Sequence, residues 1–446
     1  MFSSRKTAAP STGYNLNKSL RFRSSASAYL SRTPSVAGNQ QKWTWSGWVK
    51  KAQNGANGTL FGSGTGASTY DICFFNSNFI STNDKFNLYL GNGTYYLVSN
   101  AVYRDPSAWY HVVVAVDSTQ ATASNRMRAY INGSEITSWT STAYPAQNAT
   151  VTNYWNTTTN QTIGSFTGYS GYYLDGYMTE VNFIDGQALT PSSFGSTNAL
   201  TGVWQPAKYT GTYGTNGFYL PFTNTTSTTT LGYDFSGNSN NWTTNNISLT
   251  AGSTYDSMTD VPTLTSATAA NFCVLNPLDW GSTNFPCSNG NLTWITTTTA
   301  NGFTRGSIGM TTGKWYWEVY ATSVGAGSCY VGLAKNNSST ASTGQAIYTA
   351  NTGNKCIEGT STAYGSSWTT GDLIGVAYDA DAGTLTFYKN NTTQGAITLS
   401  GYAGVNVCPV VVDASSLAFT LDCNFGQQPF SYTPPTNFVA LNTYNI

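Results

Sequence analysis

The sequence predicts an all-β chain built from two antiparallel β-sandwiches joined by a polar connector. Short runs that alternate apolar and polar residues recur along the 446 residues, and clusters of Gly, Asn or Ser bound them. Charged residues make up only 9% of the chain, against a usual share of about 25%, whereas aromatic residues reach 14%. Glutamate occurs four times and no heptad pattern is visible, so long helices have little support.

These patterns divide the chain into four parts. Residues 1–18 form a basic N-terminal arm, 19–200 the first sandwich, 201–270 a Thr/Asn/Ser-rich connector and 271–446 the second sandwich. Within the connector, residues 217–222 (GFYLPF) predict one strand.

The first sandwich begins with a strand at residues 19–22. Further alternating runs predict strands at 43–49, 70–75, 86–90, 95–98, 109–117 and 127–131. His111, the one histidine of the sequence, lies inside such a run, which favours a structural role for its ring.

Several motifs of this segment occur in a recognisable order. They are LRF at Leu20, WSGWVK at Trp45, TLFG at Thr59, WYH at Trp109, AYING at Ala129 and LDGYMTEV at Leu174. In that order they resemble the laminin G-like branch of the concanavalin A-like lectin and glucanase superfamily. The resemblance implies a jelly-roll sandwich that binds glycan or protein.

The second sandwich carries four ordered motifs. They are GKWYWEV at Gly313, CYVGLA at Cys329, GDLIGVA at Gly371 followed by LTFYKN at Leu385, and NFGQQPF at Asn424. Together they closely resemble the SPRY family. The resemblance implies a bent β-sandwich that recognises peptides or surfaces through variable loops and carries no catalytic apparatus, so we expect two sandwiches of the concanavalin A-like, jelly-roll kind.

The segment DADAG, which begins at Asp379, separates two β-branched and aromatic runs. A calcium loop of the helical type needs Gly at its sixth position and Glu at its twelfth, but Gly383 stands fifth and Asn390 twelfth. We therefore predict a β-hairpin turn in which Gly383 supplies a positive φ, with a weak calcium contact as the alternative.

The sequence gives no support for an enzyme. A retaining glucanase needs two carboxylates about 5–5.5 Å apart, commonly delivered by one strand, yet no two glutamates stand closer than forty residues. A catalytic triad would have to use His111 as its base. A polysaccharide depolymerase is therefore only a remote alternative.

No cofactor is firmly indicated. Histidine and cysteine lack the spacings of a metal site. Calcium is the one ion left open, with Asp71, Asp84 and Asp175 as candidates by loop position only, and we assign no ligands. The seven cysteines of a chain without a predicted signal peptide favour buried free thiols over disulfides.

Charge is spread unevenly although it sums to zero. Residues 1–208 hold 14 basic and 8 acidic residues, a balance of +6, whereas residues 209–446 hold 5 and 11, a balance of −6. Nine basic residues precede Asp71, so the N-terminus is a candidate dock for an acidic protein or an anionic glycan, with Arg5, Lys6 and Lys18 as anchoring residues. A solvated basic tail is the alternative. Nothing predicts nucleic acid binding or membrane insertion.

Loop aromatics are the candidate ligand-binding residues, because aromatic rings stack on sugars while Asn and Thr bond hydroxyls. If these side chains point outward they form a glycan platform, and if they point inward they belong to the core. The candidates are Tyr154, Trp155, Tyr169, Tyr172, Tyr173, Tyr364 and Trp368.

The two domain types are joined by YTGTYGTNGFYLPF at Tyr209, and the chain ends in a segment that contains PPTNFVALN at Pro434. This combination resembles structural proteins of tailed bacteriophages, especially marine ones. The resemblance implies a virion component, such as a tail fibre or head fibre, made in the bacterial cytoplasm and present as a homo-oligomer or in many copies. We expect non-enzymatic adhesion to a host-surface glycan or protein. The alternative is a capsid or tail decoration or adaptor protein that binds only other virion proteins.

Overall fold

The computed structural model describes residues 13–66, 68–75, 84–169, 171–281, 285–297, 302–336, 344–415 and 417–446. These residues form two compact units. The first unit comprises 13–249 and 256–263, and the second comprises 250–255 and 264–446. Pairings between the described strands are antiparallel except that between β23 and β33, so the predicted all-β fold is confirmed.

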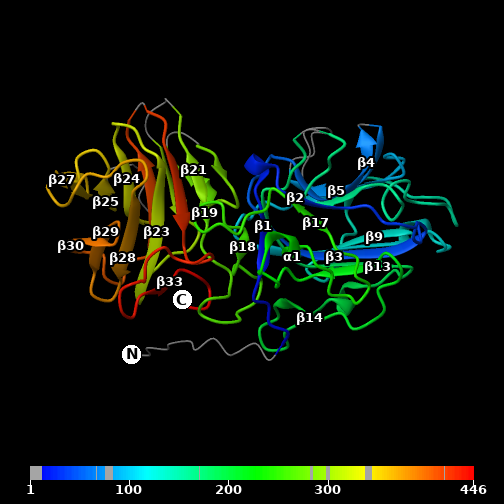
Figure 1. Ribbon diagram of the computed structural model, residues 1–446. Coiled ribbons are helices and arrows are strands. Elements are labelled where there is room, and N and C mark those ends of the chain that lie inside the picture. Colours follow the sequence, from blue (N-terminus) through cyan, green and yellow to red (C-terminus); the bar gives the residue numbers. More distant parts are fainter. Residues whose placement is uncertain are drawn as a thin grey trace. The chain divides into compact units, whose positions relative to one another are not determined.

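The first unit is a sandwich of two sheets (Figure 1). Sheet one has the order β10 (Ser134–Glu135), β9 (Met127–Ile131), β8 (Trp109–Asp117), β3 (Lys42–Lys51), β13 (Gly176–Asp185), β1 (Ser19–Phe22) and β18 (Ser257–Met258), with β16 (Phe218–Leu220) on β13. Sheet two has the order β11 (Trp139–Ala143), β7 (Tyr95–Val102), β6 (Lys85–Leu90), β5 (Thr69–Phe75), β4 (Gly58–Gly66), β12 (Gln161–Ile163), β2 (Tyr29–Arg32) and β17 (Thr243–Asn245). In Figure 1, β3, β9 and β13 belong to one layer, and β2, β4 and β5 to the other.

Short elements complete the first unit. They are the hairpin β14 (Gly195–Thr197) and β15 (Trp204–Pro206), the helix α1 (Thr228–Leu231), and the 3-10 turns Ser24–Ala26, Ala123–Asn125 and Pro191–Ser193. The strands predicted for residues 19–131 are all present. No helix among the described residues is long and apolar enough to span a bilayer.

The second unit also pairs two sheets. One has the order β19 (Leu275–Trp280), β22 (Gly302–Gly306), β31 (Val407–Asp413), β24 (Cys329–Lys335), β25 (Gln345–Thr349), β26 (Lys355–Ile357) and β27 (Thr360–Thr362). The other has the order β20 (Cys287–Ser288), β21 (Thr293–Ile295), β32 (Thr420–Asn424), β23 (Lys314–Ser323), β28 (Leu373–Asp379), β29 (Thr384–Lys389) and β30 (Thr392–Thr398), with β33 (Val439–Ala440) beside β23.

The predicted turn at Asp379 is confirmed. It joins β28 to β29, and Gly383 has a φ of 63°. The Asp379 Oδ1 accepts the N–H groups of Asp381 and Ala382 at 3.2 and 3.0 Å, and its Oδ2 pairs with Lys314 Nζ at 2.9 Å. The carboxylate is thus occupied by its own turn.

The predicted connector needs correction, because most of it belongs to the first sandwich. Strands β16, β17 and β18 pair with strands of that unit. The main core also takes in Phe218, Leu220, Phe222, Leu231 and Trp242. These apolar residues are separated by Thr- and Asn-rich sequence, so hydrophobic periodicity did not predict their burial.

The N-terminal arm is corrected in the same way for its described residues. Leu16 is buried and its N–H donates to Thr263 Oγ1 at 3.2 Å, while Thr179 Oγ1 donates to the Lys18 carbonyl at 2.8 Å. Residues 14–18 therefore pack onto the first unit. The Lys18 side chain is half-buried, and burial lowers its pKa. Arg5 and Lys6 lie outside the described residues.

The predicted electrostatic dock is wrong for the basic residues of the early strands, which form internal ion pairs. Arg21 Nε and Arg23 Nε lie 3.1 and 2.8 Å from Asp256 Oδ1. Lys50 Nζ lies 2.7 Å from Asp260 Oδ2. A buried charge has to be paired, so these three basic side chains serve the fold rather than meet a partner.

Candidate functional site

Aromatic side chains gather on the outer face of sheet two, which is the face opposite the main core. Along β5 the core takes Cys73 and Phe75, so the intervening residues Tyr70, Ile72 and Phe74 point outward. We call the outward group the aromatic row. It consists of Tyr70, Ile72, Phe74, Tyr89, Tyr96, Phe166, Tyr169 and Tyr172.

Strand register aligns the row. Tyr96 on β7 pairs with Tyr89 on β6, and Tyr89 pairs with Ile72 on β5. The rings of Tyr89 and Tyr96 are stacked with centroids 5.6 Å apart, and those of Phe74 and Tyr89 are stacked at 6.0 Å. The three rings thus form a continuous stack across β5, β6 and β7.

Gly62 leaves space for Phe166 at the other end of the aromatic row. Ile72 pairs with Gly62 on β4, and Phe166 lies over that glycine. A Cβ at Gly62 would come within 3.2 Å of the Phe166 side chain, which is tighter than ordinary contact. Phe166 in turn meets Tyr70 and Tyr172 edge-on, with centroids 6.2 and 6.3 Å away.

The row has a buried base and an accessible rim. Ile72, Phe74, Phe166 and Tyr172 are at most 7% exposed and form a compact apolar cluster. Above it Tyr70, Tyr89 and Tyr96 are half-buried, and Tyr169 is 44% exposed.

The rim hydroxyls belong to partly exposed side chains. Among the described residues, no hydrogen bond joins the hydroxyls of Tyr70, Tyr89 or Tyr96 to another protein group. Burial, with the neighbouring Tyr70 and Tyr96 hydroxyls, raises the pKa of Tyr89 to about 12. Burial and Tyr172 also raise the pKa of Tyr70. Tyr70 and Tyr89 therefore stay neutral, and their hydroxyls can both donate and accept hydrogen bonds.

The sequence candidates divide between this surface and the interior. Tyr169 and Tyr172 belong to the aromatic row, and Tyr173 is half-buried beside Tyr29 with ring centroids 6.2 Å apart. Tyr154 is half-buried too. Trp155 must be corrected: it is fully buried in the core, with its ring 4.6 Å from that of Phe61.

Two further corrections concern the second unit. Trp368 is 2% exposed and packs near Tyr348, with ring centroids 6.3 Å apart. Tyr364 is half-buried, meets Tyr348 edge-on at 5.5 Å and donates its hydroxyl to the Gly395 carbonyl. Both rings therefore contribute to an aromatic cluster of the sandwich, which was the alternative interpretation.

Sequence reasoning missed Tyr70, Tyr89, Tyr96 and Phe166. A signal was present, because the runs at 70–75 and 86–90 carry apolar or aromatic side chains on both faces. A strand with one solvated face should alternate with polar residues instead. The outward Tyr and Phe therefore marked a second apolar face.

The candidate calcium residues are engaged by protein donors. Asp71 Oδ2 accepts the backbone N–H groups of Asn153, Tyr154 and Trp155 at 2.9, 2.6 and 2.9 Å, while Oδ1 accepts that of Gly91 at 2.5 Å. Burial raises the pKa of Asp71 to about 6, although these four donors lower it. Asp71 thus fixes the 153–155 loop.

The other two carboxylates have partners as well. Asp84 forms ion pairs with Lys51 Nζ at 2.5 Å and Arg104 Nε at 3.0 Å. Asp175 Oδ2 accepts the Ser24 hydroxyl at 3.0 Å. No cluster of three or more His, Cys, Asp or Glu side chains suited to a metal occurs in the part of the chain that the structure describes.

Comparison with known families agrees with both sequence resemblances. Residues 24–193 match the model of the concanavalin A-like lectin/glucanases superfamily, and residues 314–427 match that of the SPRY domain. The aromatic row lies within the first match. Domains of both kinds are typically binding modules without catalysis.

Solved SPRY domains are among the similar structures. The SPRY domain of human HERC1 is 21% identical over 36% of this chain and 99% of its own, with a TM-score of 0.32. A human SPRY domain is 21% identical over 30% of this chain and 91% of its own, with a TM-score of 0.25. The TRIM65 PSpry domain is 17% identical over 34% and 92%, with a TM-score of 0.29.

Proposed function

We propose that this chain, which joins a concanavalin A-like domain to a SPRY domain, is a non-enzymatic adhesion protein that binds host-surface glycan through the aromatic row. The observation that carries the proposal is the set of neighbouring hydroxyls of Tyr70, Tyr89 and Tyr96 above an apolar base, for which the described part of the chain holds no hydrogen-bond partner. A polyhydroxylated ligand offers matching donors and acceptors, and its C–H faces suit ring edges.

The proposal places the protein on the particle of a tailed phage, as a tail fibre, head fibre or similar appendage. Each shallow site would bind weakly. Many copies on one particle would then add their affinities through multivalency. The low charge of the chain supports this role, because adhesion through neutral groups survives high ionic strength.

A binding measurement with hydroxyl-deleted variants tests the proposal. Full-length protein is screened on an array of bacterial capsular and lipopolysaccharide glycans, beside the double variant Tyr89→Phe/Tyr96→Phe. The variant keeps both stacked rings and loses two hydroxyls, each worth about 0.5–1.5 kcal/mol, so affinity should fall roughly 5- to 150-fold. Tyr388→Phe, at a half-buried tyrosine of the SPRY domain, is the matched control and should bind as the parent does.

One observation favours the alternative of a decoration or adaptor protein. Strand β19 lies at a sheet edge of the second unit, and its Leu278 and Trp280 side chains are 55% and 44% exposed. Exposed apolar groups on an edge strand suit a protein partner. If the array stays blank while full-length protein sediments with phage capsids or tails, and Leu278→Ser/Trp280→Ser abolishes that association, glycan adhesion is ruled out.

A further inference from the structure

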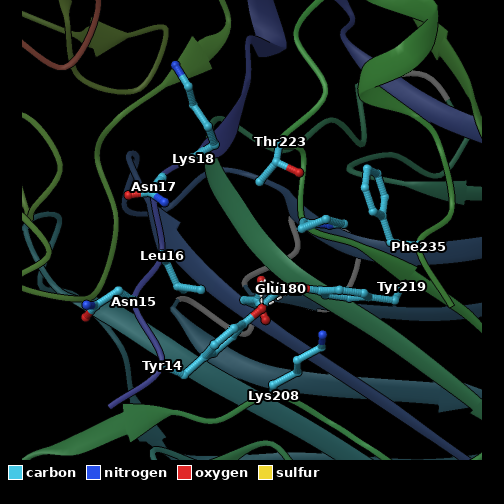
Figure 2. Close-up of a pocket in the computed structure, with 11 residues that line it drawn as sticks. Tyr14, Asn15, Leu16, Asn17, Lys18, Glu180, Lys208, Tyr219, Thr223 and Phe235 are labelled. Atoms are coloured by element: carbon cyan, nitrogen blue, oxygen red, sulfur yellow. Dashed lines mark hydrogen bonds between the residues drawn. The ribbon is translucent and has the colours of Figure 1, made fainter. Parts of the chain in front are cut away.

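A cavity of about 220 Å³ lies in the first unit, on sheet one rather than on the sheet that carries the aromatic row (Figure 2). Phe218 and Leu220 of β16 enter the main core, so Tyr219 between them points to the opposite face and into this cavity. The lining residues are Tyr14, Asn15, Leu16, Asn17, Lys18, Glu180, Lys208, Tyr219, Pro221, Thr223 and Phe235.

A β-bulge places Glu180 at the floor of the cavity. The register between β13 and β3 shifts between Thr179 and Asn182, and Glu180 has a φ of 53°. A residue other than glycine in this left-handed region is strained by roughly 1–3 kcal/mol and persists only where its surroundings fix it. Bulges of this kind redirect a side chain, here a carboxylate that is 5% exposed.

The Glu180 carboxylate is only half satisfied. Its Oε1 accepts the Tyr219 hydroxyl at 2.6 Å and the Tyr14 hydroxyl at 3.3 Å, and the two hydroxyls are 2.6 Å apart. Among the described residues no hydrogen bond reaches Oε2. Burial raises the pKa of Glu180 to about 7, while the two hydroxyls and the Lys208 ammonium lower it.

Opposite charges face the cavity without forming an ion pair. Figure 2 shows the Lys208 side chain reaching toward Glu180 and Tyr219, while the Lys18 side chain points away. Lys208 is exposed, and Phe235 at the mouth is 50% exposed. The cavity thus combines an acceptor, a donor and an apolar surface.

We propose that this cavity binds one neutral sugar ring, whose hydroxyls bridge Glu180 Oε2 and the Lys208 ammonium while its C–H face lies against Phe235. Above pH 7, where Glu180 is ionised, its carboxylate disfavours an anion, and the Lys208 ammonium disfavours a cation, which leaves a neutral polyol. The volume is below the roughly 300 Å³ at which drug-sized ligand pockets begin, so a single ring fits better than a chain. This site is independent of the aromatic row.

Saturation-transfer NMR on the full-length protein tests the site. The neutral probes are methyl α-D-glucopyranoside and N-acetylglucosamine, and the charged rivals are glucuronate, glucosamine and glycine. We expect transfer from a neutral sugar with a Kd on the order of 1 mM, and at least about tenfold weaker binding of the charged rivals.

Two variants at exposed positions connect the signal to the cavity without endangering the fold. Lys208→Met and Phe235→Ala should each weaken the neutral sugar roughly 3- to 10-fold. Tyr388→Phe in the SPRY domain should leave it unchanged. A signal lost only in Tyr89→Phe/Tyr96→Phe would belong to the aromatic row and would count against this site. The proposal is overturned if no neutral sugar gives transfer, if a charged rival binds more tightly, or if neither cavity variant weakens the signal.

Discussion

His111 allows a test of how burial shifts the pKa of a side chain in the first unit and makes stability depend on pH. The ring is 1% exposed and lies between two indoles, with centroids 4.9 Å from Trp48 and 6.0 Å from Trp204. The Trp204 indole N–H donates to Nδ1 at 3.0 Å, and Nε2 lies 2.9 Å from Ser46 Oγ. Since Nδ1 accepts a hydrogen bond, it carries no proton, and the ring is the neutral Nε2–H tautomer.

The structure predicts that the first unit becomes less stable as pH falls, because of His111. Burial lowers the pKa of His111 from 6.5 to about 3. In the unfolded chain the imidazole binds a proton below pH 6.5, whereas in the folded chain it does so only near pH 3. The free energy of unfolding is therefore highest above pH 6.5 as far as His111 is concerned, and it falls by about 1.4 kcal/mol for each pH unit below that value.

The perturbation is His111→Gln, which offers an amide to Trp204 and Ser46 but cannot be protonated. Urea unfolding of the full-length chain at several pH values between 4.5 and 7 should give a parent curve that loses about 2–3 kcal/mol more than the variant. In parallel, the Cε1–Hε1 resonance of this one histidine should not titrate near pH 6.5. Parallel stability curves, or a resonance with a midpoint near 6.5, would refute the reasoning.

Three other perturbations have defined outcomes. Asp256→Asn leaves two buried guanidiniums without their carboxylate and should lower the free energy of unfolding by about 3–5 kcal/mol in urea melts, whereas Glu135→Gln, at an exposed ion pair, should cost less than about 1 kcal/mol. Because the pKa of Glu180 is raised to about 7, the stability that its protonated form contributes is lost as pH rises from 4.5 through 7. The free energy of unfolding of Glu180→Gln should therefore exceed that of the parent by about 1–3 kcal/mol at pH 8 and equal it at pH 4. The same difference at both pH values would contradict this. Thiol labelling under native conditions should reach half-buried Cys356 first and the six buried cysteines only after unfolding, so early labelling of a buried cysteine would argue against this core.

Local patterns in the sequence predicted the features that depend on a few neighbouring residues. The hairpin at Asp379 is one, because a short turn between β-branched runs needs only Gly383 at positive φ. The strands of the first unit are another, since alternation is a local property. The direction of loop aromatics is different. Trp155 enters the core beside Phe61, whereas Phe166 packs over Gly62 on the outer face, and both partners lie about a hundred residues away in the sequence.

Charge was misread for the same reason. Arg21 and Lys50 looked like parts of a basic surface, because their carboxylate partners Asp256 and Asp260 stand more than two hundred residues later. Local sequence cannot reveal such a pair, and Thr-rich surroundings made the partners look like connector.

The internal ion pairs also bear on how this chain meets a ligand. Asp256 and Asp260 hold residues 256–263 against β1 and β3, so the scarce charges of the first unit help to specify which distant segments pair. Charges used in this way are unavailable to a partner. What remains at the aromatic row is a set of neutral hydroxyls, and in the Glu180 cavity opposite charges that offset each other. Under the proposed adhesion function, recognition by this unit should therefore rest on hydrogen bonds and apolar contact, which is the chemistry that an uncharged saccharide requires.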